Sequence, residues 1–218
     1  MKSFSIILVL LAMACTLPLC GQEFTTTYTK NNAIKINPIA FASSEFQLTF
    51  ERYFNNRKSS ISIIPSIILK DSQSEYKEAY QGKIQYRFFL SQINKADRNT
   101  FLGFSNFGFY AGVYALYIDY EEDYNNGYWD NDVGKYIEDE YHKDITAFEG
   151  GAIIGLQIDV TERILIDFTL GGGVRKANVK DTFISSVENP DYIESYGVFD
   201  PEYSGVKPSI ALNIGFTF

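Results

Sequence analysis

The sequence predicts an all-β protein, an eight-stranded antiparallel transmembrane up-and-down β-barrel. Three observations predict this fold class: segments of about ten residues alternate between apolar and polar side chains, aromatic residues make up 16% of the chain, and the last alternating segment ends on Phe218. Successive side chains of a strand point to opposite faces, so alternation over such lengths is typical of a wall with lipid on one side.

The clearest of these segments is the last one, residues 208–218. One face of it is wholly apolar, and the other is small or polar. The same alternation predicts seven further strands, at 33–42, 46–54, 60–70, 77–90, 106–117, 148–159 and 164–175. The 106–117 strand is ambiguous, because both of its faces are apolar or aromatic. Pro38 and Pro65 lack a ladder donor, which predicts bulges or strand ends at both positions.

The N-terminal segment predicts export. Lys2 is followed by an apolar run from Phe4 to about Cys15, which is typical of a cleaved signal peptide over residues 1–21. Cleavage after Gly21 removes both cysteines, Cys15 and Cys20, and with them disulfides and thiol chemistry. Lipidation at one of these cysteines is the alternative. With a barrel downstream, export predicts the outer membrane as the location.

The connections between strands predict the orientation. Short turns at 55–58 and 159–163 would face the periplasm, together with a longer connection at 91–105. The longest connections, 119–144 and 180–206, would face the outside, as in outer-membrane barrels. Both are strongly acidic: the first has ten acidic residues against two lysines. Acidic surfaces of this kind make a nucleic-acid partner unexpected.

The polar faces of the strands carry a nearly balanced set of charges. An eight-stranded barrel has an interior just wide enough for side chains, and ions inside it must be paired. We therefore expect an ion network that plugs the lumen, rather than a conducting path or a proton relay. Its expected members are Lys35, Glu51, Lys70, Lys83, Arg87, Glu149, Asp159, Asp167 and Arg175.

The 119–144 segment interleaves tyrosines with carboxylates. A divalent-cation site is one interpretation, with Asp130, Asp132, Glu138 and Glu140 as weak candidates, although their spacing does not match a calcium loop. A contact surface for an extracellular protein or glycan is a second interpretation. A solvated acidic loop, part of it extending the hairpin, is the third and simplest.

Catalytic motifs are missing from the sequence. His142 is the single histidine and has Glu140 and Asp144 close by in the chain, but no motif selects a nucleophile beside it. Nucleotide-binding, zinc-protease and paired-cysteine motifs do not occur either. The sequence therefore predicts a protein that is not an enzyme and needs no cofactor.

Four stretches carry a family resemblance: residues 35–54, 80–90 (YQGKIQYRFFL), 109–115 and 207–218 (KPSIALNIGFTF). The chain resembles the small outer-membrane β-barrels of the OmpA/OmpX kind, and in particular a family of uncharacterised outer-membrane β-barrel domains. The resemblance implies outer-membrane lipid and the barrel-assembly machinery as partners, with Phe216 and Phe218 in the assembly signal. It implies no established activity.

A structural or surface-interaction role through the acidic loops is the leading hypothesis. A small channel or transporter is the first alternative, which measurable single-channel conductance would favour. A membrane enzyme centred on His142 and a soluble lipocalin-like barrel are further alternatives. A soluble barrel would place its apolar rows inside and its polar rows outside.

Overall fold

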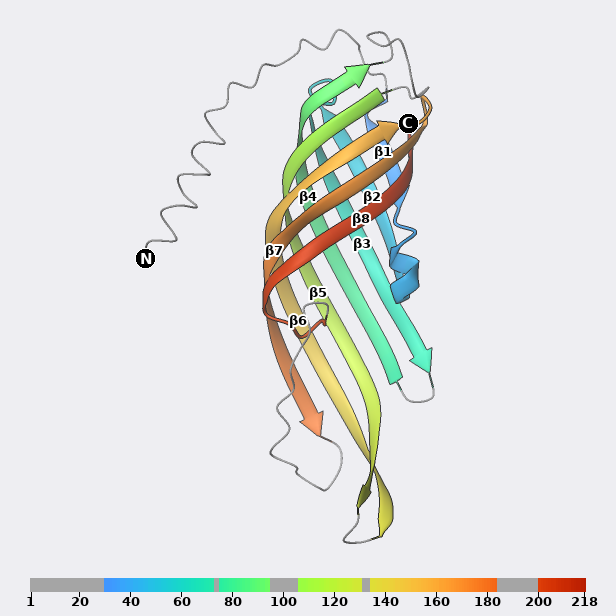
Figure 1. Ribbon diagram of the computed structural model, residues 1–218, viewed down its shortest axis with the longest axis vertical. Helices are drawn as coiled ribbons and strands as arrows, with labels where there is room; N and C mark the ends of the chain where they lie inside the picture. Colours follow the sequence, from blue (N-terminus) through green and yellow to red (C-terminus); the bar gives the residue numbers. More distant parts are fainter. Residues whose placement is uncertain (1–29, 73–74, 95–105, 131–133, 184–199) are drawn as a thin grey trace, which may run out of the picture.

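The computed structural model describes residues 30–72, 75–94, 106–130, 134–183 and 200–218 (Figure 1). These residues form one antiparallel sheet of eight strands, and the sheet closes in a ring because β1 pairs with both β2 and β8. The prediction of an all-β, eight-stranded antiparallel fold is confirmed. The expected signal peptide, residues 1–21, lies outside the described residues. The strands are β1 Asn32–Ile36, β2 Glu45–Phe54, β3 Ser59–Ser72, β4 Glu75–Asn94, β5 Asn106–Asp130, β6 Lys135–Asp159, β7 Ile164–Phe183 and β8 Gly205–Thr217.

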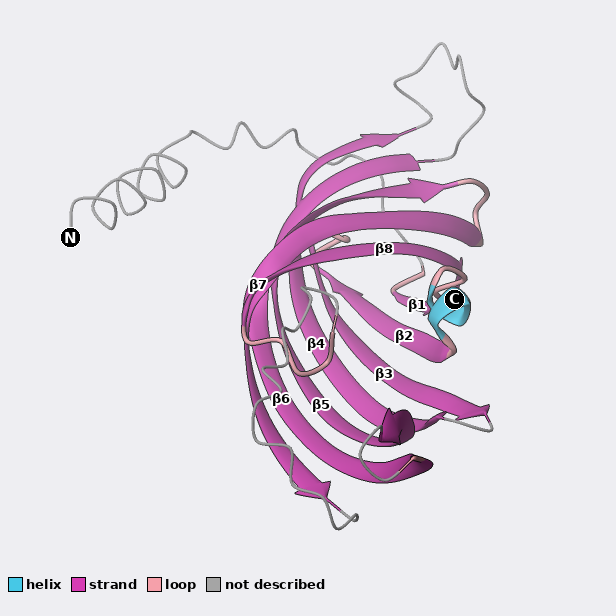
Figure 2. Ribbon diagram, turned by 60° about the horizontal axis from the view of Figure 1, so that its bottom comes forward, coloured by secondary structure: helices cyan, strands magenta, loops and turns pink. Residues whose placement is uncertain are grey.

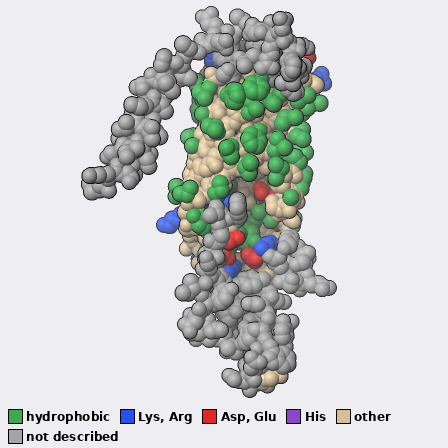
Figure 3. Space-filling model, in the orientation of Figure 1, with side chains coloured by type: hydrophobic (Ala, Val, Ile, Leu, Met, Phe, Trp, Pro, Cys, Tyr) green, Lys and Arg blue, Asp and Glu red, His purple; other side chains and the backbone are tan. Residues whose placement is uncertain are grey.

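The two faces of the wall differ as the alternation predicts. On β4, Ile84 is 58% exposed on the outer face, whereas Gln85 and Arg87 are buried on the inner face. The ambiguous strand follows the same rule: Phe109 and Val113 point outward, and Tyr110 and Tyr114 are buried inside. Figure 3 shows hydrophobic side chains spread over the upper part of the wall. The outer surface is therefore apolar, and the interior combines polar and ionic side chains with a buried hydrophobic cluster.

One end of the ring carries tight turns and the C-terminus (Figure 1). The Asn55–Lys58 turn has positive φ angles at Asn55, Asn56 and Arg57, a conformation that asparagine tolerates better than most residues. Phe218 exchanges backbone hydrogen bonds with Asn32, at 2.9 and 3.1 Å. The last residue thus lies against the first strand at this end.

At the opposite end, β5 and β6 project far beyond the other strands (Figure 1). They pair without interruption from Asn106↔Asp159 to Asp130↔Lys135. The predicted strands at 106–117 and 148–159 are therefore too short. The interpretation of 119–144 as an acidic loop that partly extends the hairpin is right about the extension and understates its length. Acidic side chains do not prevent strand pairing where water surrounds them, and the alternation of Ile118 and Tyr120 with acidic neighbours continues the pleat. Of the 180–206 connection, 184–199 lies outside the described residues, as does 95–105 between β4 and β5.

The prediction of a first strand over 33–42 is wrong, because β1 ends at Ile36. The Asn37 side chain accepts a hydrogen bond from the Ile39 backbone N–H at 3.1 Å, and it donates one to Gln47 at 2.8 Å. This turn replaces strand pairing where Pro38 has no N–H to donate. A 3₁₀ helix, η1 (Ala40–Ser43), follows.

The prediction for Pro38 as a strand end is confirmed, but the one for Pro65 is wrong. Pro65 lies inside β3, opposite Gly82 on β4, without a shift in register. On its other side, the pairing of β3 with β2 is interrupted between Ser66 and Ile63, and it resumes in the same register. The missing N–H of proline therefore breaks the ladder locally without adding a residue.

Candidate functional site

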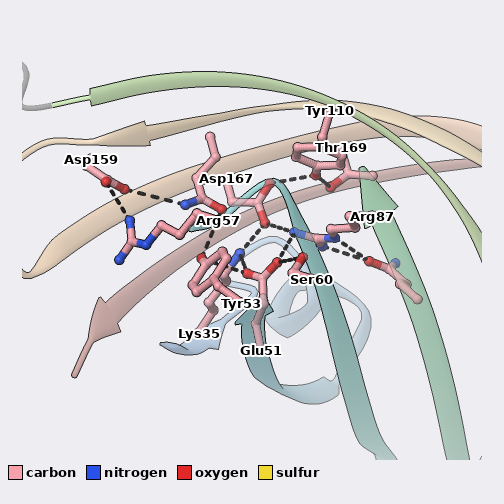
Figure 4. Close-up of polar contacts among 12 residues, drawn as sticks. Lys35, Glu51, Tyr53, Arg57, Ser60, Arg87, Tyr110, Asp159, Asp167 and Thr169 are labelled. Atoms are coloured by element: carbon pink, nitrogen blue, oxygen red, sulfur yellow. Dashed lines mark hydrogen bonds and ion pairs between the residues drawn. The ribbon is translucent and has the colours of Figure 1, made fainter. Parts of the chain in front are cut away.

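Four ions from four strands meet inside the ring near its turn end, and we call them the four-ion cluster: Lys35 (β1), Glu51 (β2), Arg87 (β4) and Asp167 (β7). The Asp167 carboxylate accepts bonds from Lys35 Nζ at 2.5 Å and from Arg87 Nη1 at 2.6 Å. Glu51 pairs with Lys35, and it lies 3.4 Å from Arg87 Nη1. All four side chains are buried (Figure 4). Two cations and two anions compensate each other here.

Neutral donors complete the four-ion cluster. Glu51 accepts hydrogen bonds from Ser60 Oγ at 2.5 Å and from Tyr53 Oη at 2.9 Å. Tyr110 Oη donates to Asp167 Oδ1 at 2.7 Å (Figure 4). Buried ions are tolerated only when they are paired and their remaining polar atoms are hydrogen-bonded. The cluster meets this condition, because each of its carboxylates is both ion-paired and hydrogen-bonded.

Gly155 on β6 makes room for this arrangement. A Cβ atom at this position would collide with the ring and hydroxyl of Tyr110 and with the Phe168 carbonyl. The absent side chain lets the Tyr110 ring of β5 lie over β6 and reach Asp167 on β7. The guanidinium of Arg87 lies 4.7 Å from the centre of the same ring.

A second ion pair, between Arg57 and Asp159, lies at the end of the ring that carries the turns. Arg57 Nη1 donates to Asp159 Oδ2 at 2.9 Å, and two other guanidinium nitrogens donate to the Lys30 carbonyl at 3.1 and 3.0 Å. The Arg57 guanidinium also lies 4.6 Å from the centre of the Tyr53 ring. The left-handed turn conformation of Arg57, with φ 62°, belongs to the Asn55–Lys58 turn that carries it to this position.

The other half of the interior is more open. Arg175 Nε donates to Glu149 Oε2 at 2.8 Å, and Tyr114 Oη donates to Glu149 Oε1 at 2.6 Å. Beside this pair lies a cavity of about 500 Å³, which we call the open cavity. Lys83 borders it, with its Nζ 5.1 Å from the centre of the Tyr114 ring. Figure 3 shows charged side chains gathered around a hollow in this part of the wall.

The structure brings the expected lumen residues together in part. Seven of them are buried inside the ring, namely Lys35, Glu51, Arg87, Glu149, Asp159, Asp167 and Arg175. Lys83 is half-buried beside the open cavity. The side chain of Lys70 lies outside what the structure describes. The described lumen residues form separate clusters rather than one network.

Of the candidate metal ligands, Asp132 and the side chains of Asp130, Glu138 and Glu140 lie outside the described part of the chain. Within the described part of the chain, no group of three or more acidic, histidine or cysteine side chains is arranged to hold a metal ion. Phe216 and Phe218, the expected assembly signal, point outward and are about half exposed.

His142 lies on β6 opposite Thr182 of β7, just before β5 and β6 project alone, and away from the interior ions. Its Nδ1 is 2.5 Å from Asp123 Oδ1, and its Nε2 is 3.4 Å from Asp144. The hydrogen bond with Asp123 raises the pKa of His142 above its ordinary value of 6.5. Glu140, its expected neighbour, has no described side chain. The contacts described for this histidine are all with carboxylates, which is an ion-pair environment without a described nucleophile.

Several interior residues are not evident from the sequence. Tyr53, Arg57, Tyr110 and Tyr114 all contact the interior ions, and Lys143 bonds Glu202 at 3.2 Å. Arg57 sits in a predicted turn, where an arginine usually faces solvent. Tyr110 and Tyr114 alternate with Phe109 and Val113, so spacing alone does not say which row is inside. The one signal for the inward position of these tyrosines is the pair of glycines Gly155 and Gly173. A Cβ atom added at either glycine would meet Tyr110 or Tyr114.

Comparison with known proteins gives no family for this chain. No family model matches it, and no curated protein matches its sequence. Among the described residues, no helix is both long enough and apolar enough to cross a membrane.

Proposed function

We propose that the protein is an outer-membrane β-barrel with a plugged lumen, which serves a structural or surface-interaction role through its projecting acidic hairpin. The observation that carries the proposal is that the two faces of the wall are inverted relative to a soluble protein, with apolar side chains outside and ions inside. Every strand exposes large apolar side chains outward while ions are buried inside. Examples from β1 to β8 are Ile34, Phe50, Ile63, Ile84, Val113, Ile154, Leu170 and Ile210.

This surface is unusual for a protein surrounded by water. Contiguous apolar patches on soluble monomers rarely exceed a few hundred Å². Here the apolar side chains belong to all eight strands, and Phe148 and Ile154 alone are 64% and 60% exposed. A lipid surrounding removes the cost of exposing them to water, at roughly 25 cal/mol per Å². The inversion also disfavours a soluble lipocalin-like barrel.

The packed interior disfavours a channel. The four-ion cluster joins β1, β2, β4 and β7 across the ring, and its side chains are at most 1% exposed. An ion crossing this layer would have to separate buried pairs, which costs several kcal/mol for each uncompensated charge. β5 and β6, in contrast, carry Glu121 and Asp144 at 50% and 58% exposure, where they still pair with β4 and β7 at the base of the projecting hairpin. This hairpin is the part of the molecule available to an external partner.

Membrane fractionation combined with heat-modifiability on a gel tests location and barrel closure. We expect the protein in the outer-membrane fraction, with faster migration of the unheated form. Recovery in the soluble periplasmic fraction would contradict the proposal. Conductance in planar bilayers from the purified protein would instead favour the channel.

Single cysteine variants test the orientation. Glu121→Cys at the base of the hairpin should react with a membrane-impermeant thiol reagent on intact cells, whereas Lys58→Cys in the opposite turn should react only after lysis. The parent chain gives the background labelling. The reverse pattern would contradict the assignment of the hairpin to the outside.

A further inference from the structure

The wall of the ring has a lateral gap beside β8. Ala33 pairs with Thr217 and Ile36 with Ile214, so continued pairing would set residues 37–43 against 207–213. Those residues instead form the turn and η1. Among the described residues, the 207–213 part of β8 therefore pairs with β7 but with no strand on its other side. Figure 2 shows η1 folded at the edge of the ring next to β1 and β2.

Pro208 lies in this unpaired stretch. Proline within a sheet is confined to edges, strand starts and bulges, because it cannot donate to a neighbouring strand. Pro208 pairs with Gly172 of β7 on one side and has no described strand on the other, so β8 is a local edge here inside a closed ring. The gap thus follows from sequence features on both sides: Asn37 and Pro38 end β1, and Pro208 suits an edge.

The open cavity extends to both sides of this gap. Ser43, Glu45 and Gln47 line it from η1 and β2, and Lys207, Ser209 and Ala211 line it from β8. Its volume of about 500 Å³ lies within the ~300–1,000 Å³ usual for small-molecule sites. The cavity therefore lies directly behind the opening in the wall.

The charges around the open cavity leave one positive charge uncompensated. Arg175 is neutralised by Glu149 at 2.7 Å, and Lys77 is neutralised by Glu122 at 2.9 Å. Lys83 and Lys207 make no ion pair with any residue that the structure describes, and Glu45 is the remaining carboxylate of the lining. Two lysines against one carboxylate suit a monoanion.

Part of the lining is apolar. Ile68, Leu116 and Ile118 face the cavity from β3 and β5, and Pro208 and Ile210 stand at the gap. On the outer side of β8, Val206 and Ile210 are 70% and 64% exposed. Apolar side chains thus lie among the polar ones of the lining, and further apolar side chains follow on the outer surface beside the gap.

We propose that the open cavity binds a long-chain carboxylate of the fatty-acid type. Lys83 and Lys207 hold its head group, and its hydrocarbon chain leaves through the lateral gap. Charge-assisted hydrogen bonds from two ammonium groups fix the carboxylate, and the chain packs against the apolar part of the lining and, outside the gap, against the apolar outer surface. The inference rests on the proposed membrane location, since lipid on the outer surface would receive the chain.

Photo-crosslinking of a diazirine analogue of palmitate to the purified protein in non-ionic detergent tests the site. We expect the Lys83→Gln/Lys207→Gln double variant to bind at least tenfold more weakly, and each single variant to show a smaller loss. Lys176→Gln is the matched control, because this exposed lysine on β7 carries the same charge but does not line the cavity. Its binding should stay within twofold of the parent.

Competition distinguishes the ligand classes. Unlabelled palmitate should displace the probe, whereas palmitate methyl ester and inorganic phosphate should not do so at the same concentration. Equal competition by the methyl ester, or unchanged binding by the double variant, would overturn the carboxylate site. Equal competition by phosphate would reduce the site to one for anions without a chain.

Heat-modifiability of each preparation shows that a variant is folded, so lost binding cannot come from misfolding. A parent protein that fractionates with the outer membrane but fails to bind the probe overturns this inference alone. A parent protein in the soluble fraction overturns the proposed location, whatever its binding.

Discussion

The two halves of the ring interior use the same kinds of residue to different ends. Near the turns, the four-ion cluster has two cations and two anions in direct contact, with tyrosine and serine hydroxyls on the carboxylates. In the other half, Lys83 and Lys207 border a cavity and have no partner ion among the described residues. One half is compensated and filled, whereas the other has a cavity bordered by ion pairs and by these two lysines.

The difference teaches how to separate a structural charge from one that is available to a ligand. A buried ion that is fully paired is compensated in the folded protein. Removal of one partner leaves the other ions buried in a low dielectric without compensation, which destabilises the fold. A lysine beside a cavity keeps access to water or to a ligand. Removal of a charge should therefore lower the free energy of unfolding much more in the four-ion cluster than beside the open cavity.

Asp167→Ala should have the largest effect. It leaves Lys35 and Arg87 with Glu51 alone, and loss of one partner from a buried ion cluster costs about 3–5 kcal/mol. We expect the urea midpoint of unfolding, followed by heat-modifiability in detergent, to fall sharply. A midpoint equal to that of the parent would mean that the four-ion cluster does not hold the ring together.

Gly155→Ala should have the next largest effect. The added methyl group would collide with the Tyr110 ring, and overpacking of this kind costs about 1–3 kcal/mol. The same urea titration measures it. Gly82→Ala is the control, because a Cβ there would meet no atom within 4 Å. Equal losses in both variants would point to strand propensity rather than to the Tyr110 contact.

Lys83→Gln and Lys207→Gln should barely change stability. Neither side chain has an ion partner among the described residues, so the free energy of unfolding should stay within about 0.5 kcal/mol of the parent. These variants should instead change only the binding of the carboxylate probe. A loss comparable to that of Asp167→Ala would remove the distinction between the two halves.

The pH dependence of His142 should give the smallest effect. Asp123 raises the pKa of this histidine, so the stabilisation by its charged form is complete below the ordinary pKa of about 6.5 and is lost as the pH rises through the raised value. Because the chain has one histidine, a proton NMR titration reports it alone. The Asp123→Asn variant should titrate at a lower pH than the parent; an unchanged midpoint would exclude this hydrogen bond as the cause.

Much of the wall could be predicted from residue spacing. The rule that side chains alternate along a strand places Ile84 outside and Arg87 inside without further information, and it gave seven of the expected lumen ions a buried position. Spacing could not predict which ions meet. Lys35 and Asp167 are 132 positions apart in the chain, and only the closure of β1 against β8, beside β7, brings them within 2.5 Å.

The sequence by itself determined the apolar outer face, the polar inner face and the balance of charge between them, because these depend on a local period of two. The tertiary structure decided the contacts among those charges, the inward placement of Tyr110 and Tyr114, and the return of Arg57 into the end of the ring. It also decided where the ring stays open, since the gap arises only when the end of β1 is set against β8. Local alternation fixes which way a side chain points; register and closure fix what it meets.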